Sequence, residues 1–376
     1  MIKRTLRSNC CICESANLSS FKEIAKFPAY MGVTDKSTEE DLFFDQNWGV
    51  CANCGLLQLL DLLPLDILYS ENHSTEAVGE TWNSHHDEFA NFISATTKQK
   101  ILEIGGAHGE LARRLFRMQS DLEYTFVEPS PGKLPDKCQV VIGYIENHLD
   151  LVSMSDSVVH SHVLEHIYTP TKFIDEVASR MKLDSKMFIS YPNIEQLLLT
   201  GGTNSLNFEH TYFLTPNQLE VMCLNAGLEL TRAARFRNHS FFWELTKTES
   251  NRSTLRIPNI ESKNSLFESL WESLSDFVEV CNLKIEHSEI PTYIFGAHIF
   301  SQGLITLGLQ DKCIDGILDN AVEKQNKRLY GTNLQVFNPD KIANLPSVRV
   351  ILRATHYQDE IKHQLKSINP SVEIIE

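Results

Sequence analysis

The chain has 376 residues, of which 42% are hydrophobic and 22% are charged, so it can form two or three folded domains with apolar cores. Its formal net charge of −15 argues against nucleic acid as a partner, because no basic block offsets the acidity. We find no apolar run that predicts a membrane span and no signal-peptide core at the start, and therefore expect a cytoplasmic protein.

Two Cys-x-x-Cys pairs stand near the start of the chain. Cys10 and Cys13 form the first pair, and Cys51 and Cys54 form the second. In a reducing compartment, matched pairs favour metal binding over disulfides or ordinary buried thiols, and four thiolates complete the coordination of a structural zinc ion. We expect Cys10 rather than Cys11 to be the ligand, because Cys10 is separated from Cys13 by two residues. Apolar residues around the second pair predict the strands of a small ribbon.

A polar, irregular stretch follows from Tyr69 to Trp82, and residues 85–93 have a helical pattern of apolar side chains. Asn72 and His73 lie in the polar stretch. It is interpreted either as a substrate-contacting loop or as a solvated linker.

The next 150 residues alternate between short apolar runs and helical patterns. This alternation predicts a parallel, doubly wound sheet. The expected strands lie at 101–104, 124–128, 140–143, 157–161 and 187–191.

A polar run at 249–254 predicts a linker to a second, smaller α/β unit. We expect a long amphipathic helix at 266–278, strands at 292–298, 314–319 and 348–352, and a closing helix at 360–366.

A glycine-rich turn follows the first of the central strands. It reads Glu103-Ile-Gly-Gly-Ala-His-Gly109, so Gly105, Gly106, Ala107 and Gly109 stand where a ligand can approach the backbone. An acid ahead of the glycines would repel a pyrophosphate, but it suits a ligand with a cationic amino-acid end. The alternative is a nicotinamide-binding or purely structural turn.

Glu128 ends the following strand, where a carboxylate can accept both hydroxyls of a ribose. Together with the glycine turn, this acid describes a site for S-adenosylmethionine. Ile104-Gly105-Gly106 and Glu128-Pro129 resemble the first two motifs of class I methyltransferases. Their position predicts that the adenine lies near Glu146, Ser161 and His162.

Methyl transfer to an acceptor that is not already a free nucleophile needs a base. His160, His162 and His166 follow or end the fourth strand, and a second segment carries Glu209, His210 and Tyr212. Both segments are expected at the same sheet edge, with Glu209 and His210 as an acid–base pair. A structural or solvent-exposed role for these histidines is the alternative.

The layout of the whole chain resembles the sugar C-methyltransferases of deoxysugar biosynthesis. The resemblance rests on the cysteine pairs, Asn207-Phe-Glu-His210, Asn238-His239-Ser240 and the C-terminal markers Gly296-Ala297-His298, Asp319-Asn320 and Lys324. Where the family has Tyr-x-Glu-His, this chain has Asn207 in place of the tyrosine. Asn72 and His73 also stand where that family has tyrosines.

That resemblance implies an α/β protein in three parts. These are a zinc-ribbon-like module at 1–75, a class I methyltransferase Rossmann-like core at 76–248, and a second Rossmann-like domain at 249–376. It implies that His210, Glu209 and His166 carry acid–base chemistry beside a nucleotide-linked ketosugar. O-methylation of a sugar or another small polar metabolite, and a non-catalytic binding protein, are the alternative hypotheses. The oligomeric state is open.

Overall fold

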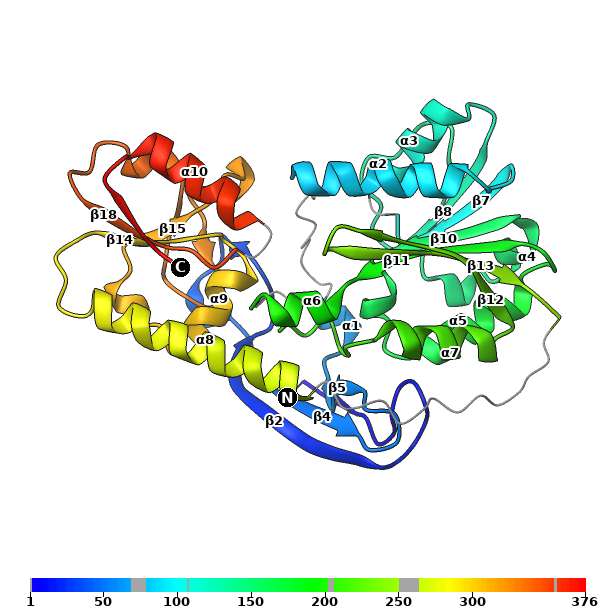
Figure 1. The fold of residues 1–376 in the computed structure, drawn as a ribbon, viewed down its shortest axis with the longest axis horizontal. Coiled ribbons are helices and arrows are strands. Elements are labelled where there is room, and N and C mark those ends of the chain that lie inside the picture. Colours follow the sequence, from blue (N-terminus) through cyan, green and yellow to red (C-terminus); the bar gives the residue numbers. More distant parts are fainter. Residues whose placement is uncertain (1, 69–78, 107, 202–205, 250–263, 355–356) are drawn as a thin grey trace.

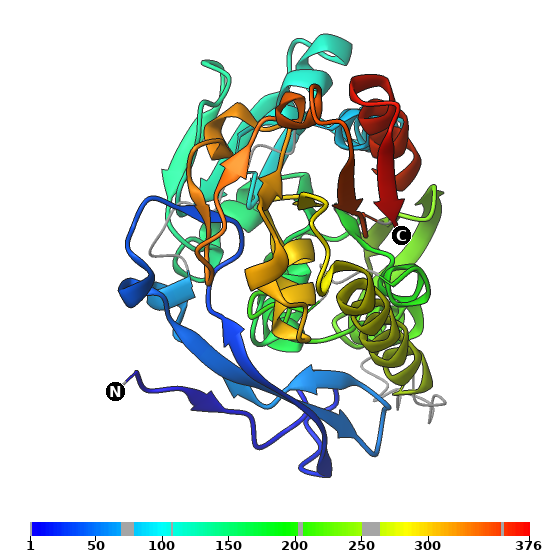
Figure 2. The same cartoon turned by 90° about the vertical axis from the view of Figure 1, so that its left-hand side faces the viewer.

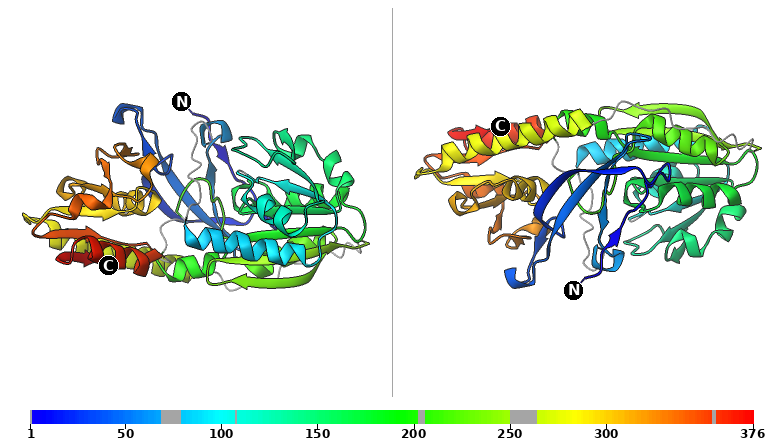
Figure 3. Two further views of the ribbon diagram at one scale, coloured as in Figure 1. Left: turned by 90° about the horizontal axis from the view of Figure 1, so that it is seen from above. Right: turned by 90° about the horizontal axis from the view of Figure 1, so that it is seen from below.

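The computed structural model describes residues 2–68, 79–106, 108–201, 206–249, 264–354 and 357–376. Most of the polar stretch at 69–82, Ala107 and nearly all of the expected linker therefore lie outside the described residues. Two α/β lobes occupy opposite ends of the molecule, and strands from the N-terminal segment lie between them (Figure 3).

The larger lobe is built on a seven-stranded sheet with the order β12-β13-β11-β10-β7-β8-β9. Its strands are β7 (Lys100–Ile104), β8 (Glu123–Glu128), β9 (Gln139–Ile142), β10 (Ser157–Ser161), β11 (Lys186–Pro192), β12 (Leu228–Phe236) and β13 (Ser240–Lys247). The first five are parallel, which confirms the predicted doubly wound sheet.

A hairpin of β12 and β13 completes this sheet and was not predicted. β13 runs antiparallel to both of its neighbours, so the sheet is mixed rather than purely parallel. Most residues of β12 are exposed or half-buried, which weakens the apolar signal that marks a strand in sequence.

Helices cover both faces of the large sheet, as the repeated strand–helix pattern requires. In Figure 1, α2 (Glu80–Ser94) and α3 (Glu110–Met118) lie above the sheet, and α5 (Pro170–Arg180) and α7 (Pro216–Asn225) lie below it. A capping box of Thr215 and Gln218 starts α7. The remaining helices of this lobe are α4 (Asp150–Met154) and α6 (Ile194–Leu199).

The smaller lobe has a parallel five-stranded sheet with the order β17-β15-β14-β18-β19. Its elements are α8 (Asn264–Ile285), β14 (Thr292–Phe295), α9 (Ile299–Thr306), β15 (Gly316–Leu318), β16 (Arg328–Leu329), β17 (Val336–Phe337), β18 (Val348–Ile351), α10 (Gln358–Ile368) and β19 (Val372–Ile375). The expected second α/β unit is confirmed. The prediction that α10 closes the chain is wrong, because β19 follows it and pairs with β18 at the sheet edge.

The N-terminal segment forms a three-stranded antiparallel sheet of β2 (Leu18–Pro28), β4 (Phe43–Cys51) and β5 (Leu57–Leu59). Figures 1 and 2 both show these strands below the two lobes. Its shorter elements are β1 (Thr5–Leu6), β3 (Val33–Thr34), β6 (Asp61–Leu62) and α1 (Leu65–Leu68). The predicted strands around the second cysteine pair are confirmed, whereas β2 was not predicted.

Hydrogen bonds join this N-terminal sheet to the smaller lobe. β3 pairs with β16, and the buried side chain of Gln302 in α9 bonds the backbone of Tyr30, Gly32 and Tyr330. One continuous apolar core runs from the N-terminal sheet into α8 and the smaller lobe. The N-terminal module therefore does not rely on its own small core.

Six 3-10 turns complete the description: Thr38–Glu40, Ile145–Asn147, Leu164–His166, Asp311–Cys313, Val322–Lys324 and Pro339–Ile342. Among the described helices, we find none with the length and apolar character that a membrane crossing requires.

An ion pair between Asp41 and Arg328 gives a test of the join between the N-terminal module and the smaller lobe. The two Nη atoms of Arg328 each lie 2.7 Å from one carboxylate oxygen of Asp41, whose side chain is 2% exposed. We expect Asp41→Ala to lower the free energy of unfolding by about 3 kcal/mol, because the substitution leaves a buried guanidinium without its counter-ion. Urea-induced unfolding measures this change.

Asp35→Ala is the matched control. The side chain of Asp35 is 74% exposed and pairs with Lys327 at 3.6 Å, so its removal should change stability by less than about 0.5 kcal/mol. Equal effects of the two substitutions would show that the ion pair of Asp41 does not hold the module to the lobe.

Candidate active site

The glycine turn lies between β7 and α3, at the carboxyl edge of the large sheet. Gly105 and Gly109 have φ angles of 74° and 71°, which side-chain-bearing residues rarely adopt. At Gly106, a Cβ atom would approach the ring of Phe126 to 2.2 Å. These glycines are therefore required by the turn and its packing, independently of any ligand.

Glu103 ends in the interior beneath this turn. Its side chain is buried, and the hydroxyl of Tyr124 donates a 2.7 Å hydrogen bond to its Oε2. Burial raises the pKa of Glu103 to about 7, an effect that the hydrogen bond from Tyr124 only partly offsets. A cationic group placed beside Glu103 would restore its negative charge at neutral pH.

The other predicted cofactor residues lie along the same edge. Glu128 is buried at the end of β8 and accepts a 2.9 Å hydrogen bond from the amide of Ser130. Ser161 ends β10 and His162 follows it, both half-buried, whereas Glu146 is exposed. His162 has a φ of 52°, a strained conformation of the kind that gathers at functional sites.

Two histidine-bearing segments meet at this edge, as the sequence predicts. The ring centroids of His166 and His210 lie 4.8 Å apart. The sequence predicted that Glu209 pairs with His210. In the structure Glu209 contacts His166 instead, with its Oε2 3.5 Å from Nδ1 of His166. Asn207 explains how this segment is held, since its side-chain oxygen accepts hydrogen bonds from the amides of both Glu209 and His210.

Glu165 stands between the histidines and was not singled out from the sequence. Its Oε1 is 3.1 Å from Nδ1 of His162, and it lies within 4.8 Å of ligand atoms of His166 and His210. Burial opposes ionisation of Glu165, but the hydrogen bond from His162 and the neighbouring imidazoles lower its pKa to about 2. Glu165 is therefore an anion at neutral pH.

His210 is held in the neutral form, in which its ring can accept a proton. Burial, followed by the field of His166, lowers its pKa to about 3, so the ring is neutral at physiological pH. Among the described residues, none hydrogen-bonds to its buried Nδ1. His298, which caps α9 of the smaller lobe, also contributes to this lowering. The smaller lobe thus reaches the edge where His210 lies.

Two residues predicted for the active site, Tyr212 and His160, make contacts that stabilise the fold. The hydroxyl of Tyr212 donates to the carbonyl of Leu164, and burial raises its pKa well above the ordinary value. This hydrogen bond fixes the segment after His210 against the 3-10 turn that carries His166. His160 is fully buried and packs against Phe173 of α5.

Arg7 joins both histidine segments to the N-terminal module, and no sequence pattern pointed to it. Its Nη1 donates to the carbonyls of Leu59 (3.1 Å) and Thr211 (2.9 Å), and its Nη2 donates to Tyr168 (2.8 Å) and the hydroxyl of Thr211 (3.0 Å). One guanidinium therefore joins β5, the residue after His210 and the loop after His166.

Backbone pairing strengthens this connection. The amide of Leu59 donates to Thr211, and the amide of Phe213 donates to Leu57, so β5 runs beside the segment that follows His210. The strand begins three residues after Cys54. The position of the second cysteine pair therefore influences where His210 stands.

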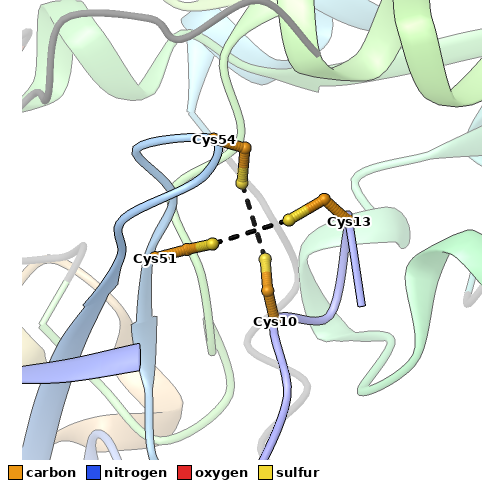
Figure 4. Close-up of side chains that lie close together, drawn as sticks. All are labelled: Cys10, Cys13, Cys51 and Cys54. Atoms are coloured by element: carbon orange, nitrogen blue, oxygen red, sulfur yellow. Dashed lines mark hydrogen bonds between the residues drawn. The ribbon is translucent and has the colours of Figure 1, made fainter. Parts of the chain in front are cut away.

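The four predicted metal ligands converge. Figure 4 shows the sulfurs of Cys10, Cys13, Cys51 and Cys54 pointing toward a common centre. Cys10 Sγ lies 3.6 Å from Cys54 Sγ, and Cys13 Sγ lies 3.5 Å from Cys51 Sγ.

The donor set fits a tetrahedral zinc ion. The hydrogen bond with Cys54 lowers the pKa of Cys10 to about 5 and raises that of Cys54, and a divalent cation would favour the thiolate form of both sulfurs. Four sulfur ligands leave no open position, so such an ion is structural. Burial raises the pKa of Cys11 to about 12, and Cys11 is not one of the four.

The C-terminal markers form a second cluster, in the smaller lobe. The carboxylate of Asp319 accepts hydrogen bonds from the amides of Ala297 (2.7 Å) and Ala321 (2.9 Å) and pairs with Lys324 at 3.2 Å. Asn320 instead bonds Gln364 of α10. In this structure, Asp319 holds the turn after β14 that ends at His298.

Comparison with known proteins identifies the central part of the chain. Residues 78–233, under half of the chain, match a family described as a methyltransferase domain. The match indicates that the protein is an enzyme with a methyltransferase domain. A search of curated proteins gave no match.

Solved structures with related folds include several methyltransferases. Human N-acetylserotonin methyltransferase in complex with SAM is 13% identical, with a TM-score of 0.39, and the match covers 49% of this chain and 59% of that one. Magnesium protoporphyrin IX methyltransferase from Synechocystis PCC 6803 with bound SAH is 12% identical, with a TM-score of 0.34 and coverages of 45% and 84%.

A third structure is a riboflavin-type dimethyltransferase from Streptomyces davawensis, which is 14% identical with a TM-score of 0.37 and coverages of 44% and 55%. The chain thus spans less than two thirds of this structure and of the human enzyme. Sequence identities and TM-scores this low give no information about the molecule that accepts the methyl group.

The cysteine cluster yields a prediction about metal content. We expect Cys51→Ser to lose one zinc ion per chain and to unfold the N-terminal module at lower urea concentration, because a structural site with three thiolates binds zinc poorly. Turnover should also fall, since β5 positions the segment after His210. Elemental analysis after dialysis against a weak chelator measures the zinc.

Cys313→Ser is the control, because Cys313 lies in the smaller lobe and is not one of the four convergent cysteines. It should leave the zinc content unchanged. An unchanged zinc content in Cys51→Ser would reject the four-cysteine site.

Proposed function

We propose that the protein transfers a methyl group to a carbon atom of a nucleotide-linked ketosugar, in polysaccharide or natural-product sugar biosynthesis. The observation that carries the proposal is the grouping of His210, His166, Glu209 and Glu165 at the carboxyl edge of the large sheet, beside the glycine turn. The field of His298, in the smaller lobe, also lowers the pKa of His210.

Each residue has a role in this proposal. Neutral His210 accepts a proton from the carbon next to the ketone, and the resulting enolate carbon forms the new bond. Ionised Glu165 stabilises the imidazolium that His210 becomes, and Glu209 orients His166 beside the ketone oxygen. S-adenosylmethionine, when bound, supplies the methyl group.

The cofactor residues follow the sequence prediction. We propose that Glu103 binds the ammonium of the cofactor and Glu128 its ribose, while Gly105, Gly106, Ala107 and Gly109 allow close approach. Glu146, Ser161 and His162 flank the adenine in this proposal. The cysteine cluster holds a structural zinc ion.

We also propose three structural units with boundaries at 1–75, 76–248 and 249–376. We propose that the third unit holds the nucleotide end of the acceptor, and the contribution of His298 at the start of α9 to the lowered pKa of His210 supports this role.

Exchange of a substrate proton for deuterium distinguishes carbon methylation from O-methylation. In D₂O without cofactor, the enzyme should exchange the proton next to the ketone of a nucleotide-linked ketosugar, and labelled cofactor should then place the methyl on that carbon. O-methylation is the second candidate, since the unpartnered Nδ1 of His210 could equally deprotonate a hydroxyl. Transfer only to hydroxyls, with no exchange, would reject carbon methylation.

The role of His210 predicts the effect of its removal. We expect His210→Ala to lower turnover by about 100-fold or more while cofactor affinity stays the same, because a general base acts only on the chemical step. Steady-state kinetics and calorimetry measure the two quantities. The control His287→Ala removes a histidine whose side chain is 92% exposed, and it should change neither; unchanged turnover in His210→Ala would reject the base assignment.

The raised pKa of Glu103 predicts a pH dependence. Below pH 7 the folded protein holds Glu103 protonated and neutral, so affinity for S-adenosylmethionine should rise as the pH increases through about 7. We expect Glu103→Gln to bind the cofactor about 10- to 100-fold more weakly and to lose this pH dependence. Calorimetry at several pH values measures both effects.

The raised pKa of Glu103 also predicts that the free energy of unfolding of the cofactor-free protein falls as the pH rises, whereas the cofactor affinity rises. Burial of the Glu103 carboxylate costs nothing below the ordinary pKa of 4.5 and its full amount above about 7, so this group destabilises the fold as the pH rises through that window.

Glu123→Gln is the control for Glu103→Gln, because Glu123 lies on the same sheet but its side chain is 60% exposed. A cofactor affinity that is flat with pH in the unmodified protein would contradict the assignment of Glu103.

A further inference from the structure

We propose a second metal site, formed by His85 of α2, His162 after β10 and His239 in the turn before β13, which binds a divalent transition metal such as zinc or cobalt. One ring nitrogen from each of the three lies within 4.8 Å of the others. The cysteine cluster does not include these residues, and the proposal does not depend on the acceptor of the methyl group.

The spacing of the three rings matches a metal centre. Their centroids are 5.3, 5.6 and 5.7 Å apart. With metal–nitrogen bonds of about 2.0–2.1 Å, three imidazoles in a tetrahedral arrangement have centroids about 5.2 Å apart. The ring centroids are therefore only a few tenths of an ångström farther apart than in such a centre, and the nitrogens, which lie within 4.8 Å of one another, would draw closer to bind one ion.

His85 supplies the strongest single observation. Its side chain is fully buried, and within the described parts of the chain no hydrogen-bond partner reaches its Nδ1. A buried polar atom without a partner carries a free-energy cost, which a metal ion would remove. Burial also lowers the pKa of His85 far below its ordinary value, so the ring keeps the neutral form that binds metals.

Two of the three rings have a hydrogen-bonding partner on one nitrogen, as metal-ligating histidines usually do. Ser190 contacts Nε2 of His85 at 2.8 Å, and Glu165 contacts Nδ1 of His162 at 3.1 Å. The carboxylate–imidazole contact is the familiar outer partner of a metal ligand, and it explains why an anion is buried beside these histidines.

Ser240 now lies between the other two rings. Its hydroxyl is 3.0 Å from Nε2 of His162 and 2.6 Å from Nδ1 of His239. A metal bound to Nε2 of His162 would take the place of the first contact, so the Ser240 hydroxyl would have to turn away from His162.

Trp82 closes one side of the cluster. Its ring centroid is 5.2 Å from that of His85 and 4.9 Å from those of His162 and His239. Three nitrogen ligands leave the fourth position of a tetrahedral ion open to a water or an oxygen ligand. Because His162 is also part of the predicted cofactor edge, that position faces the region of the reaction.

Cobalt binding tests the proposal. Co²⁺ is added to the full-length protein that already holds zinc in its cysteine site, and bound cobalt is measured by equilibrium dialysis and visible absorption. We expect one Co²⁺ per chain with a spectrum that lacks a thiolate charge-transfer band. His239→Ala should weaken this binding by at least about 100-fold, and Glu165→Gln by about 10- to 100-fold.

Two further variants keep the test decisive. His239→Cys should retain cobalt and add a thiolate charge-transfer band, which a merely structural histidine would not produce; this variant serves if His239→Ala fails to fold. His287→Ala should bind cobalt as the unmodified protein does. Equal cobalt binding in His239→Ala, or no saturable cobalt binding in the unmodified protein, would overturn the proposal.

Discussion

The four hydrogen bonds of the Arg7 guanidinium are the contact on which the arrangement of the candidate site depends. They join a strand of the N-terminal module, the residue after His210 and the loop after His166. A planar cation with fixed donors is suited to this task, because it satisfies several carbonyls at once in a defined geometry. This contact adds to the hydrogen bond from Tyr212 to Leu164 in holding the two loops together.

The N-terminal module is therefore integrated with both lobes through packing and hydrogen bonds. Its sheet shares a core with the smaller lobe, and its last strand pairs with the segment that follows His210. The strand begins three residues after Cys54, so the proposed zinc site and the segment that follows His210 are connected through the backbone.

The electrostatics of the edge follow from burial. Burial keeps His85 and His210 neutral and raises the pKa of Glu103, whereas Glu165 stays ionised because imidazoles surround it. Buried Glu165 thus lies between two groups of histidines. It can stabilise positive charge on either side, as an imidazolium at His210 or as a cation held by His162.

The sequence determined the features that depend on local spacing. The alternation of strands and helices, the glycine turn before α3 and the Cys-x-x-Cys pairs can be read from neighbouring residues, because backbone periodicity and ligand geometry act over a few positions. Only the tertiary structure decided that Glu209 contacts His166 rather than His210, and that Arg7, His85 and His239 reach the same edge. These contacts join residues up to about 200 positions apart, and their geometry depends on how the lobes and the N-terminal module pack, which no local pattern records.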